Sequence, residues 1–159
     1  MFLSVFDLYK IGIGPSSSHT MGPMVAARRF LMHLRDVKFP TDARLRVSLH
    51  GSLAFTGKGH GTDRAIILGL AGQTPDAIDP DAVEGILEAM ASRKSVTLDD
   101  GRRLAFDPAT DVIFDYGPTL KGHANGMMFF TEDGAGTRDN SVTYYSIGGG
   151  FVQIGRAHV

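Results

Sequence analysis

Helical and strand-like patterns are segregated along this chain of 159 residues, and their order constrains the fold more than any single motif. Apolar residues at spacings of three and four, typical of helices, gather between residues 24 and 93. Short apolar or alternating runs, bounded by Gly and Asp turns, dominate residues 96–147. The sequence therefore predicts one α+β domain with a largely antiparallel or mixed sheet and helices packed on one face.

Three segments carry the helical pattern. The first has an apolar stripe made of Met24, Ala27, Leu31 and Leu34. Its arginines fall largely off this stripe, which predicts a solvated face containing Arg28, Arg29 and Arg35. The second helix is expected over residues 64–70, with Thr62 as its N-cap. The third is expected from Asp79-Pro80 to about Arg93, because Asp caps a helix and Pro suits its first position.

The expected strands lie at residues 44–50, 96–98, 103–106, 111–116, 126–131 and 141–147. Asp99-Asp100-Gly101 predicts a tight hairpin turn between the second and third of them. A Gly/Asp turn at residues 133–136 predicts another hairpin between the last two. Residues 56–63 are expected to form a glycine-rich loop, and residues 5–9 fit either a strand or a helical turn.

The most unusual stretch is Ser16-Ser17-Ser18-His19-Thr20, which lies between Gly14-Pro15 and Gly22-Pro23, where the first helix should begin. One N-cap needs one hydroxyl, which Ser17, Ser18 or Thr20 could supply. Four hydroxyls in five residues exceed that need. Together with helix-start N–H groups they would suit a carboxylate or a phosphate. The alternative is a flexible serine-rich loop with a solvated histidine.

Three histidines, His19, His60 and His123, have glycines or hydroxyls around them. Histidine titrates near neutrality, so each is a candidate acid or base. Asp63 follows His60 by three residues and could orient it, and Asn125 offers both a donor and an acceptor. His33 and His50 have no such setting, and we expect them to be surface or locally hydrogen-bonded residues.

Other chemistries remain open but have weaker support. A three-histidine metal site is conceivable, although the spacing matches no local ligand motif, and we expect no metal site in this chain. A Ser-His-Asp hydrolase lacks the Gly-x-Ser-x-Gly elbow. Residues 56–59 resemble a phosphate loop only faintly, because the full Walker pattern is absent.

Composition narrows the class of protein. The net charge is -1, with 16 basic and 17 acidic residues, so no general field favours nucleic acid or an acidic membrane. We expect neither partner, and a cytoplasmic location. The chain contains no cysteine, which excludes disulfides, thiolate catalysis and a thiolate-held cluster within it.

Five segments together resemble the β domain of bacterial iron–sulfur L-serine dehydratases: residues 4–8, 11–20 with 22–23, 59–63, 123–127 and 145–151. The resemblance runs from residue 2 to about residue 152. The Gly-Pro-Ser-Ser-Ser-His-Thr block is highly specific. One departure is Ala124, where the family usually has proline. A similar fold occurs in the small-ligand-binding domain of some phosphoglycerate dehydrogenases.

The resemblance implies an L-serine ammonia-lyase that forms pyruvate and ammonia. In that family a separate α domain holds a [4Fe-4S] cluster through cysteines, and the β domain lends residues to the active site at the interface. Carried onto this chain, His60 would be the base, supported by Asp63. The substrate-binding set would be Ser16, Ser17, Ser18, His19, Thr20, Thr62, His123 and Asn125.

The same resemblance sets the expected organisation: residues 1–153 form the β domain, and residues 154–159 look like translated sequencing adapter, a non-native tail. The cluster-bearing α domain or subunit is absent from this chain. The expected partners are that α part, L-serine and further copies of the full enzyme. A stand-alone regulatory module that binds serine without chemistry is the main alternative.

Overall fold

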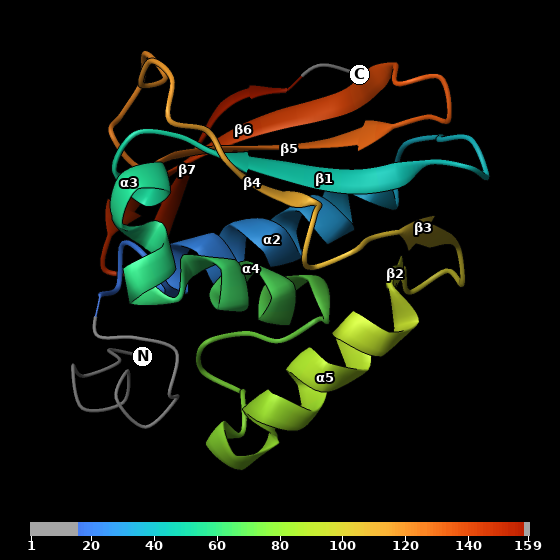
Figure 1. Cartoon of the computed structure of the whole chain (residues 1–159), viewed down its shortest axis with the longest axis horizontal. Coiled ribbons are helices and arrows are strands. Elements are labelled where there is room, and N and C mark those ends of the chain that lie inside the picture. Colours follow the sequence, from blue (N-terminus) through green and yellow to red (C-terminus); the bar gives the residue numbers. More distant parts are fainter. Residues whose placement is uncertain (1–15, 158–159) are drawn as a thin grey trace.

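The computed structural model describes residues 16–157, which form four α-helices and a seven-stranded mixed sheet (Figure 1). The helices are α2 (Met21–Leu34), α3 (Ser52–His60), α4 (Thr62–Leu70) and α5 (Val83–Arg93), the last preceded by a 3₁₀ turn at Pro80–Ala82. The strands are β1 (Arg44–Leu49), β2 (Ser95–Thr97), β3 (Arg103–Ala105), β4 (Val112–Phe114), β5 (Gly126–Glu132), β6 (Arg138–Gly148) and β7 (Phe151–Ala157). The predicted α+β class is confirmed.

Strand β1 lies in the middle of the sheet, whose order is β2-β3-β1-β5-β6-β7, with β4 also paired to β1. Its pairing with β5 is antiparallel, whereas its pairings with β3 and β4 are parallel. The two predicted hairpins, β2–β3 and β5–β6, are present and antiparallel. Strand β7, which was not among the expected strands, extends the sheet beyond β6.

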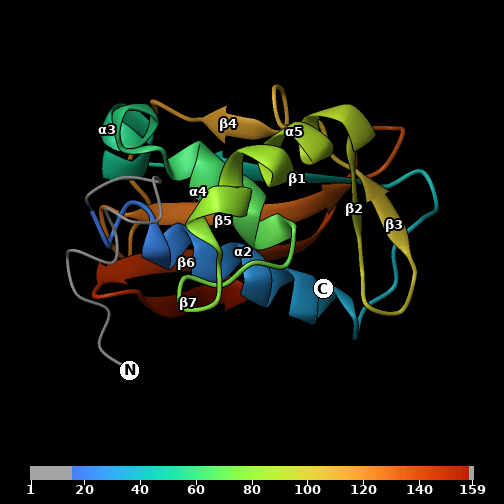
Figure 2. The same ribbon diagram turned by 90° about the horizontal axis from the view of Figure 1, so that it is seen from below.

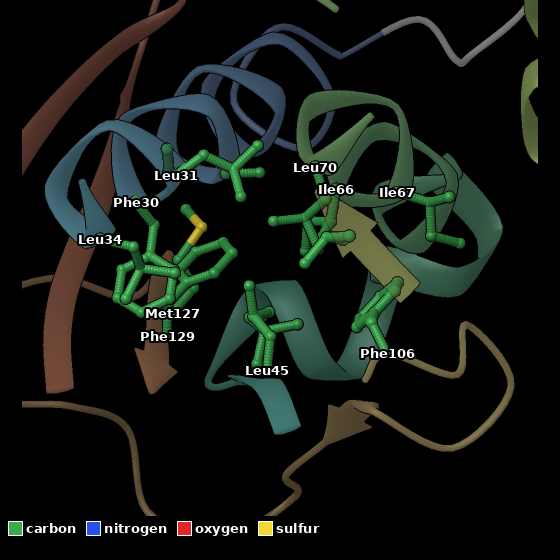
Figure 3. Close-up of a cluster of buried hydrophobic side chains, with 14 of the residues drawn as sticks. Phe30, Leu31, Leu34, Leu45, Ile66, Ile67, Leu70, Phe106, Met127 and Phe129 are labelled. Atoms are coloured by element: carbon green, nitrogen blue, oxygen red, sulfur yellow. The ribbon is translucent and has the colours of Figure 1, made fainter. Parts of the chain in front are cut away.

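Helices α2, α4 and α5 lie on the same side of the sheet, as predicted (Figures 1 and 2). The first helix buries the predicted stripe: Met24, Ala27, Leu31 and Leu34 are all at most 6% exposed. Between helices and sheet lies the main core, which Figure 3 shows. Phe30 of α2 packs on Phe129 of β5 with ring centroids 5.4 Å apart. Burial of these side chains provides the main stabilisation of the layered fold.

Strand β1 buries the predicted apolar positions Leu45, Val47 and Leu49 in the core, although Ser48 between the last two is buried as well. Its arginines meet Asp111, the buried residue just before β4: Arg44 Nη1 lies 2.6 Å from Oδ2 and Arg46 Nε lies 3.3 Å from Oδ1. Paired in this way, the buried carboxylate joins β1 to its parallel neighbour.

One sequence prediction was wrong: residues 56–63 do not form a loop. Most of them belong to α3, which ends where Gly61 adopts a left-handed backbone with φ of 74°. A Cβ at Gly57 would lie 3.2 Å from Cβ of Thr62, so the glycine allows α3 to approach α4. Glycines disfavour helices by themselves, and this tertiary contact outweighs that preference.

The predicted start of the third helix is confirmed. Asp79 Oδ1 accepts the N–H of Asp81 at 2.9 Å, and Pro80 occupies the first position. In the part of the chain that the structure describes, no helix is both long and apolar enough to cross a membrane. The expectations for residues 4–8, 5–9 and 11–15 lie outside the described residues. Residues 154–157 pair with β6, which does not test the predicted non-native origin of the tail.

Candidate active site

Four of the motif segments meet at one end of the sheet, where α2 begins and α3 meets α4 (Figure 1). Gly149, in the β6–β7 turn, donates its N–H to Ser17 Oγ at 3.2 Å. Ser52, the first residue of α3, donates its N–H to the Ala124 carbonyl at 2.9 Å. Segments far apart in sequence therefore converge on the start of α2.

His19 is the centre of this cluster and is only 8% exposed. Its Nδ1 lies 2.9 Å from Ser18 Oγ and 3.4 Å from Ser16 Oγ. Its Nε2 lies 2.9 Å from Thr56 Oγ1 and 3.1 Å from Ser52 Oγ. Because both ring nitrogens are partnered, His19 joins the serine run to α3.

The hydroxyl of Thr56 identifies the tautomer of His19. A threonine hydroxyl has one proton to donate. Thr56 directs it to the Ser52 carbonyl at 2.7 Å, so the same oxygen accepts toward the imidazole. His19 Nε2 therefore carries the ring proton, and Nδ1 accepts from Ser18. Burial, together with the nearby His60 ring, lowers the pKa of His19 below its ordinary value of 6.5.

Ser52, Thr56 and His60 lie on one face of α3, because residues four apart in a helix are neighbours. The sequence analysis missed Ser52 and Thr56 as site residues. Their spacing of four from each other and from His60 is the signal that could have found them. It was hidden because residues 56–63 were expected to form a loop.

The His60 ring is half-buried and lies against His19, with ring centroids 4.7 Å apart. Its Nδ1 lies 2.8 Å from the Thr56 carbonyl, an oxygen that can only accept. The proton of neutral His60 is therefore on Nδ1, and Nε2 keeps its lone pair. Among the described residues, no hydrogen-bond partner is recorded for Nε2. This is the arrangement that a general base requires.

One predicted N-cap is confirmed in position and one is wrong. Thr20, one of the three candidates, occupies the N-cap position of α2, but it makes no side-chain capping hydrogen bond, and its hydroxyl donates to the Ser16 carbonyl. Gly61, not Thr62, is the N-cap of α4. The fully buried Thr62 hydroxyl donates to the His19 carbonyl at 2.6 Å. Both threonines thus hold the serine–histidine segment in place.

Of the predicted anion-binding hydroxyls, Ser17 is the best placed to donate. Its Oγ accepts the N–H of Gly149, which leaves its own proton available. Ser18 donates to His19, and Ser16 Oγ lies 3.2 Å from Ser18 Oγ. The protons of Thr20 and Thr62 are directed to backbone carbonyls.

His123 and Asn125 lie in the β4–β5 loop, which reaches the cluster through Ala124 and Ser52. His123 is exposed, and its Nδ1 accepts the N–H of Asn125 at 3.0 Å. Asn125 Nδ2 donates to the Ser146 carbonyl at 3.2 Å. These contacts shape the loop beside the cluster, and a role for either side chain in substrate binding stays a prediction.

Asp63 lies in the first turn of α4, where its Oδ1 accepts the N–H of Arg64 at 3.0 Å. The recorded partner of His60 Nδ1 is the Thr56 carbonyl rather than this carboxylate. A supporting role for Asp63 stays a prediction. His50, expected to be locally bonded, has its Nε2 2.8 Å from Ser48 Oγ.

No cysteine occurs in the chain, and no group of three or more His, Asp or Glu side chains among residues 16–157 is arranged to hold a metal ion. A [4Fe-4S] cluster held by thiolates therefore does not fit the residues of this chain. The site is built instead from hydroxyls, backbone groups and two histidine rings.

Fold and site together define an α+β domain with a hydroxyl-rich site around a pair of histidine rings. The chain belongs to the serine dehydratase beta chain family, whose model matches residues 4–156.

The chain is 44% identical to an L-serine dehydratase of Streptomyces coelicolor over 96% of this chain and 34% of that protein. It is 42% identical to an L-serine dehydratase of Haemophilus influenzae, over 98% of this chain and 34% of that protein. It is also 42% identical to L-serine dehydratase 1 of Escherichia coli, over 94% of this chain and 33% of that protein. The chain thus spans about a third of the length of these relatives.

Proposed function

We propose that this chain is the β part of an L-serine ammonia-lyase, in which it binds the substrate carboxylate and supplies a histidine base. The observation that carries the proposal is the His19–His60 pair, with one ring fully bonded and the other keeping Nε2 available. Relatives named L-serine dehydratase support the substrate class.

The two rings have different roles in this proposal. His19 is kept neutral and oriented by four hydroxyl contacts, so it positions the serine run rather than exchanging protons. His60 Nε2 would take the α-proton of the bound amino acid. Because Nδ1 donates to a carbonyl, the positive charge that forms on the ring is stabilised there.

The carboxylate would lie at the start of α2. Ser17 has a hydroxyl proton to donate, and the helix N-terminus favours negative charge. Holding the carboxylate there makes the α-proton easier for a nearby base to remove, because the donors stabilise the negative charge that develops on the substrate as the proton leaves. Ser16 and Ser18 complete this side of the proposed pocket.

The proposal assigns a [4Fe-4S] cluster to a separate α part. The greater length of the relatives, and a family described as a beta chain, support a further part of the enzyme beyond this chain. Without cysteine, this chain alone would not form pyruvate from L-serine. The main alternative is a serine-binding module without chemistry. Such a module would need the Ser17 end of the site but no free Nε2 on His60, so the histidine pair favours the enzyme.

The test is His60→Ala in the enzyme assembled from this chain and its cysteine-bearing α part. Removing a general base should lower turnover by roughly 10²–10⁴-fold. Wash-out of the α-proton of L-serine into heavy water should fall in parallel, while the visible absorbance of the cluster stays unchanged.

His33→Ala is the matched control, because His33 lies near the C-terminal end of α2, away from the His19–His60 pair at its start. This variant should keep near-normal turnover. Near-normal proton exchange in His60→Ala would contradict the base assignment. If the assembled wild-type pair binds L-serine but yields no pyruvate, the binding module is the better description.

A further inference from the structure

A cavity lies away from the histidine cluster, between α2, the end of α4, α5 and β2. It has a volume of about 280 Å³, close to the lower end of the range for ligand pockets, so it suits a small molecule. The elements that line it can be followed in Figure 2. Arg35, on its rim, lies 14 residues beyond Met21, or about 20 Å along α2 from the first site.

The charge around this cavity is concentrated and positive. Three arginines line it, Arg28 from α2, Arg35 just after the end of α2 and Arg93 from α5, against one carboxylate, Asp99. The whole chain has a net charge of -1, so this excess is local. The sequence had predicted a solvated arginine face on α2. Instead, Arg28 is half-buried at the cavity wall.

Among residues 16–157, all three guanidinium groups have donors without a hydrogen-bond partner. Arg35 Nη1 lies 3.6 Å from Asp99, and both side chains are at least half exposed, so the pair is weak. The one contact of Arg93 within this part of the chain joins Nη2 to the Met90 sulfur, 3.8 Å away. Among residues 16–157, neither Arg28 nor Arg93 forms an ion pair. A guanidinium presents five donors that match phosphate and carboxylate oxygens in pairs.

The C-terminal end of α4 also lines the cavity, and its carbonyls would oppose an anion if they were free. They are largely satisfied: the N–H of Ala71 reaches Ile67, that of Gly72 reaches Gly69 and that of Gln73 reaches Leu68. The floor is apolar, with Leu31 and Met90 buried beneath the arginines. Arg28 is half-buried beside these apolar side chains, so its attraction for an anion is stronger than in bulk water, whereas Arg35 and Arg93 are exposed.

We propose that this cavity is a second binding site, for a small doubly charged anion such as a phosphate monoester or a dicarboxylate, held by Arg28 and Arg93. Both classes of anion carry two or more acceptor oxygens on a molecule small enough for the cavity. The proposal is independent of the reaction at His60, because the two sites lie at opposite ends of α2 and α4 and have no residue in common.

The test uses the 159-residue chain with inorganic phosphate and malonate as probes, followed by calorimetry at low salt. At least one probe should bind saturably, and Arg28→Gln and Arg93→Gln should each weaken that binding roughly tenfold or more. Arg29→Gln removes the same charge from the neighbouring position, outside this cavity, and should change the affinity little. The probe that binds more tightly identifies the class of anion.

Far-UV circular dichroism checks the fold of each variant. If Arg28→Gln fails to fold, Arg28→Lys keeps the charge without the paired donors and should still weaken binding. Absence of saturable binding at concentrations on the order of 10 mM would overturn the proposal. An equal loss of affinity in Arg29→Gln would also overturn it, because it would indicate attraction by the general positive charge of this surface rather than by the cavity. Binding lost in Ser17→Ala but kept in Arg28→Gln would assign the anion to the first site, against this proposal.

Discussion

At the scale of single residues, Thr56 is the least expected member of the site. Its hydroxyl accepts from His19 Nε2 while its carbonyl accepts from His60 Nδ1. One exposed residue of α3 therefore sets the protonation pattern of both rings. Its hydroxyl can be removed by mutation without touching its carbonyl, which separates the two contacts.

Thr56→Val should weaken the tautomer preference of His19 and leave His60 as it is. Loss of the hydroxyl should cost about 0.5–1.5 kcal/mol of unfolding free energy, the usual worth of one hydrogen bond. Nitrogen-15 shifts of the two imidazoles measure the tautomers, and urea unfolding measures the stability. Thr56→Ser is the control and should resemble the wild type. An unchanged His19 tautomer in Thr56→Val would show that Ser52 alone orients the ring.

Part of the site could be predicted from sequence because its members are neighbours in the chain. The hydroxyl run and His19 stand together in residues 16–20, and local chemistry indicated an anion site there. Thr20 does occupy the N-cap position of α2, although its side chain makes no capping bond. The cap at Thr62 was predicted wrongly, because a local rule assigns the nearest N–H and cannot foresee a carbonyl from another segment. The Thr62 hydroxyl donates to the carbonyl of His19, 43 positions earlier in the chain, and no local sequence pattern predicts a contact over that separation.

At the scale of elements, the crossing of α2 and α4 depends on Gly69. A Cβ built there would lie 2.4 Å from the Met24 carbonyl and 2.7 Å from Ala27 Cβ. Backbone cannot rotate away as a flexible side chain can. The helices must separate if any larger residue is placed at this position, although Gly69 itself lies within a helix, where alanine is intrinsically preferred.

Gly69→Ala should therefore lower the unfolding free energy by about 1–3 kcal/mol, as expected for overpacking. Gly85→Ala, in α5, is the matched control, because nothing lies within 4 Å of its added Cβ. That variant should instead gain about 0.5–1 kcal/mol from helix preference alone. Thermal and urea unfolding measure both. Stabilisation in both variants would contradict the tight crossing.

The elements that were predicted well from the sequence are those whose apolar residues recur at a clear helical or strand spacing. The stripe on α2 and the apolar positions of β1 both reappear as burial. Helix α3 was missed because Gly57 and Gly59 lower its local preference. The parallel pairings of β1 with β3 and β4 could not be anticipated either, since they join segments about 60 residues apart.

At the scale of the whole molecule, two buried histidines couple stability to pH. Burial lowers the pKa of His19 and also that of His50, where the nearby Asp115 carboxylate acts in the opposite direction. A histidine with a lowered pKa stays neutral in the folded chain at a pH where the unfolded chain already binds a proton. Its contribution to stability is complete above about pH 6.5 and is lost as the pH falls toward the folded pKa.

The unfolding free energy of the chain should accordingly fall as the pH is lowered through about 6.5 toward the folded pKa values of the two histidines. Urea unfolding across this range measures the fall, and His19→Gln should make the slope shallower if the variant folds. Proton NMR titration of the two rings gives an independent check, with both midpoints expected below 6.5. A His19 midpoint above that value would contradict the burial argument.

The face of α3 that carries Ser52, Thr56 and His60 also limits how this chain can change its length. Each residue added to a helix turns everything after it by about 100°. One residue inserted between Thr56 and His60 would therefore swing the His60 ring away from His19 and from the Thr56 carbonyl. Insertions of three or four residues would nearly restore its direction but move it about 5–6 Å along the axis. Among natural variants and engineered chains alike, α3 should tolerate substitutions at its exposed positions other than Thr56, and length changes only before Ser52 or after Gly61.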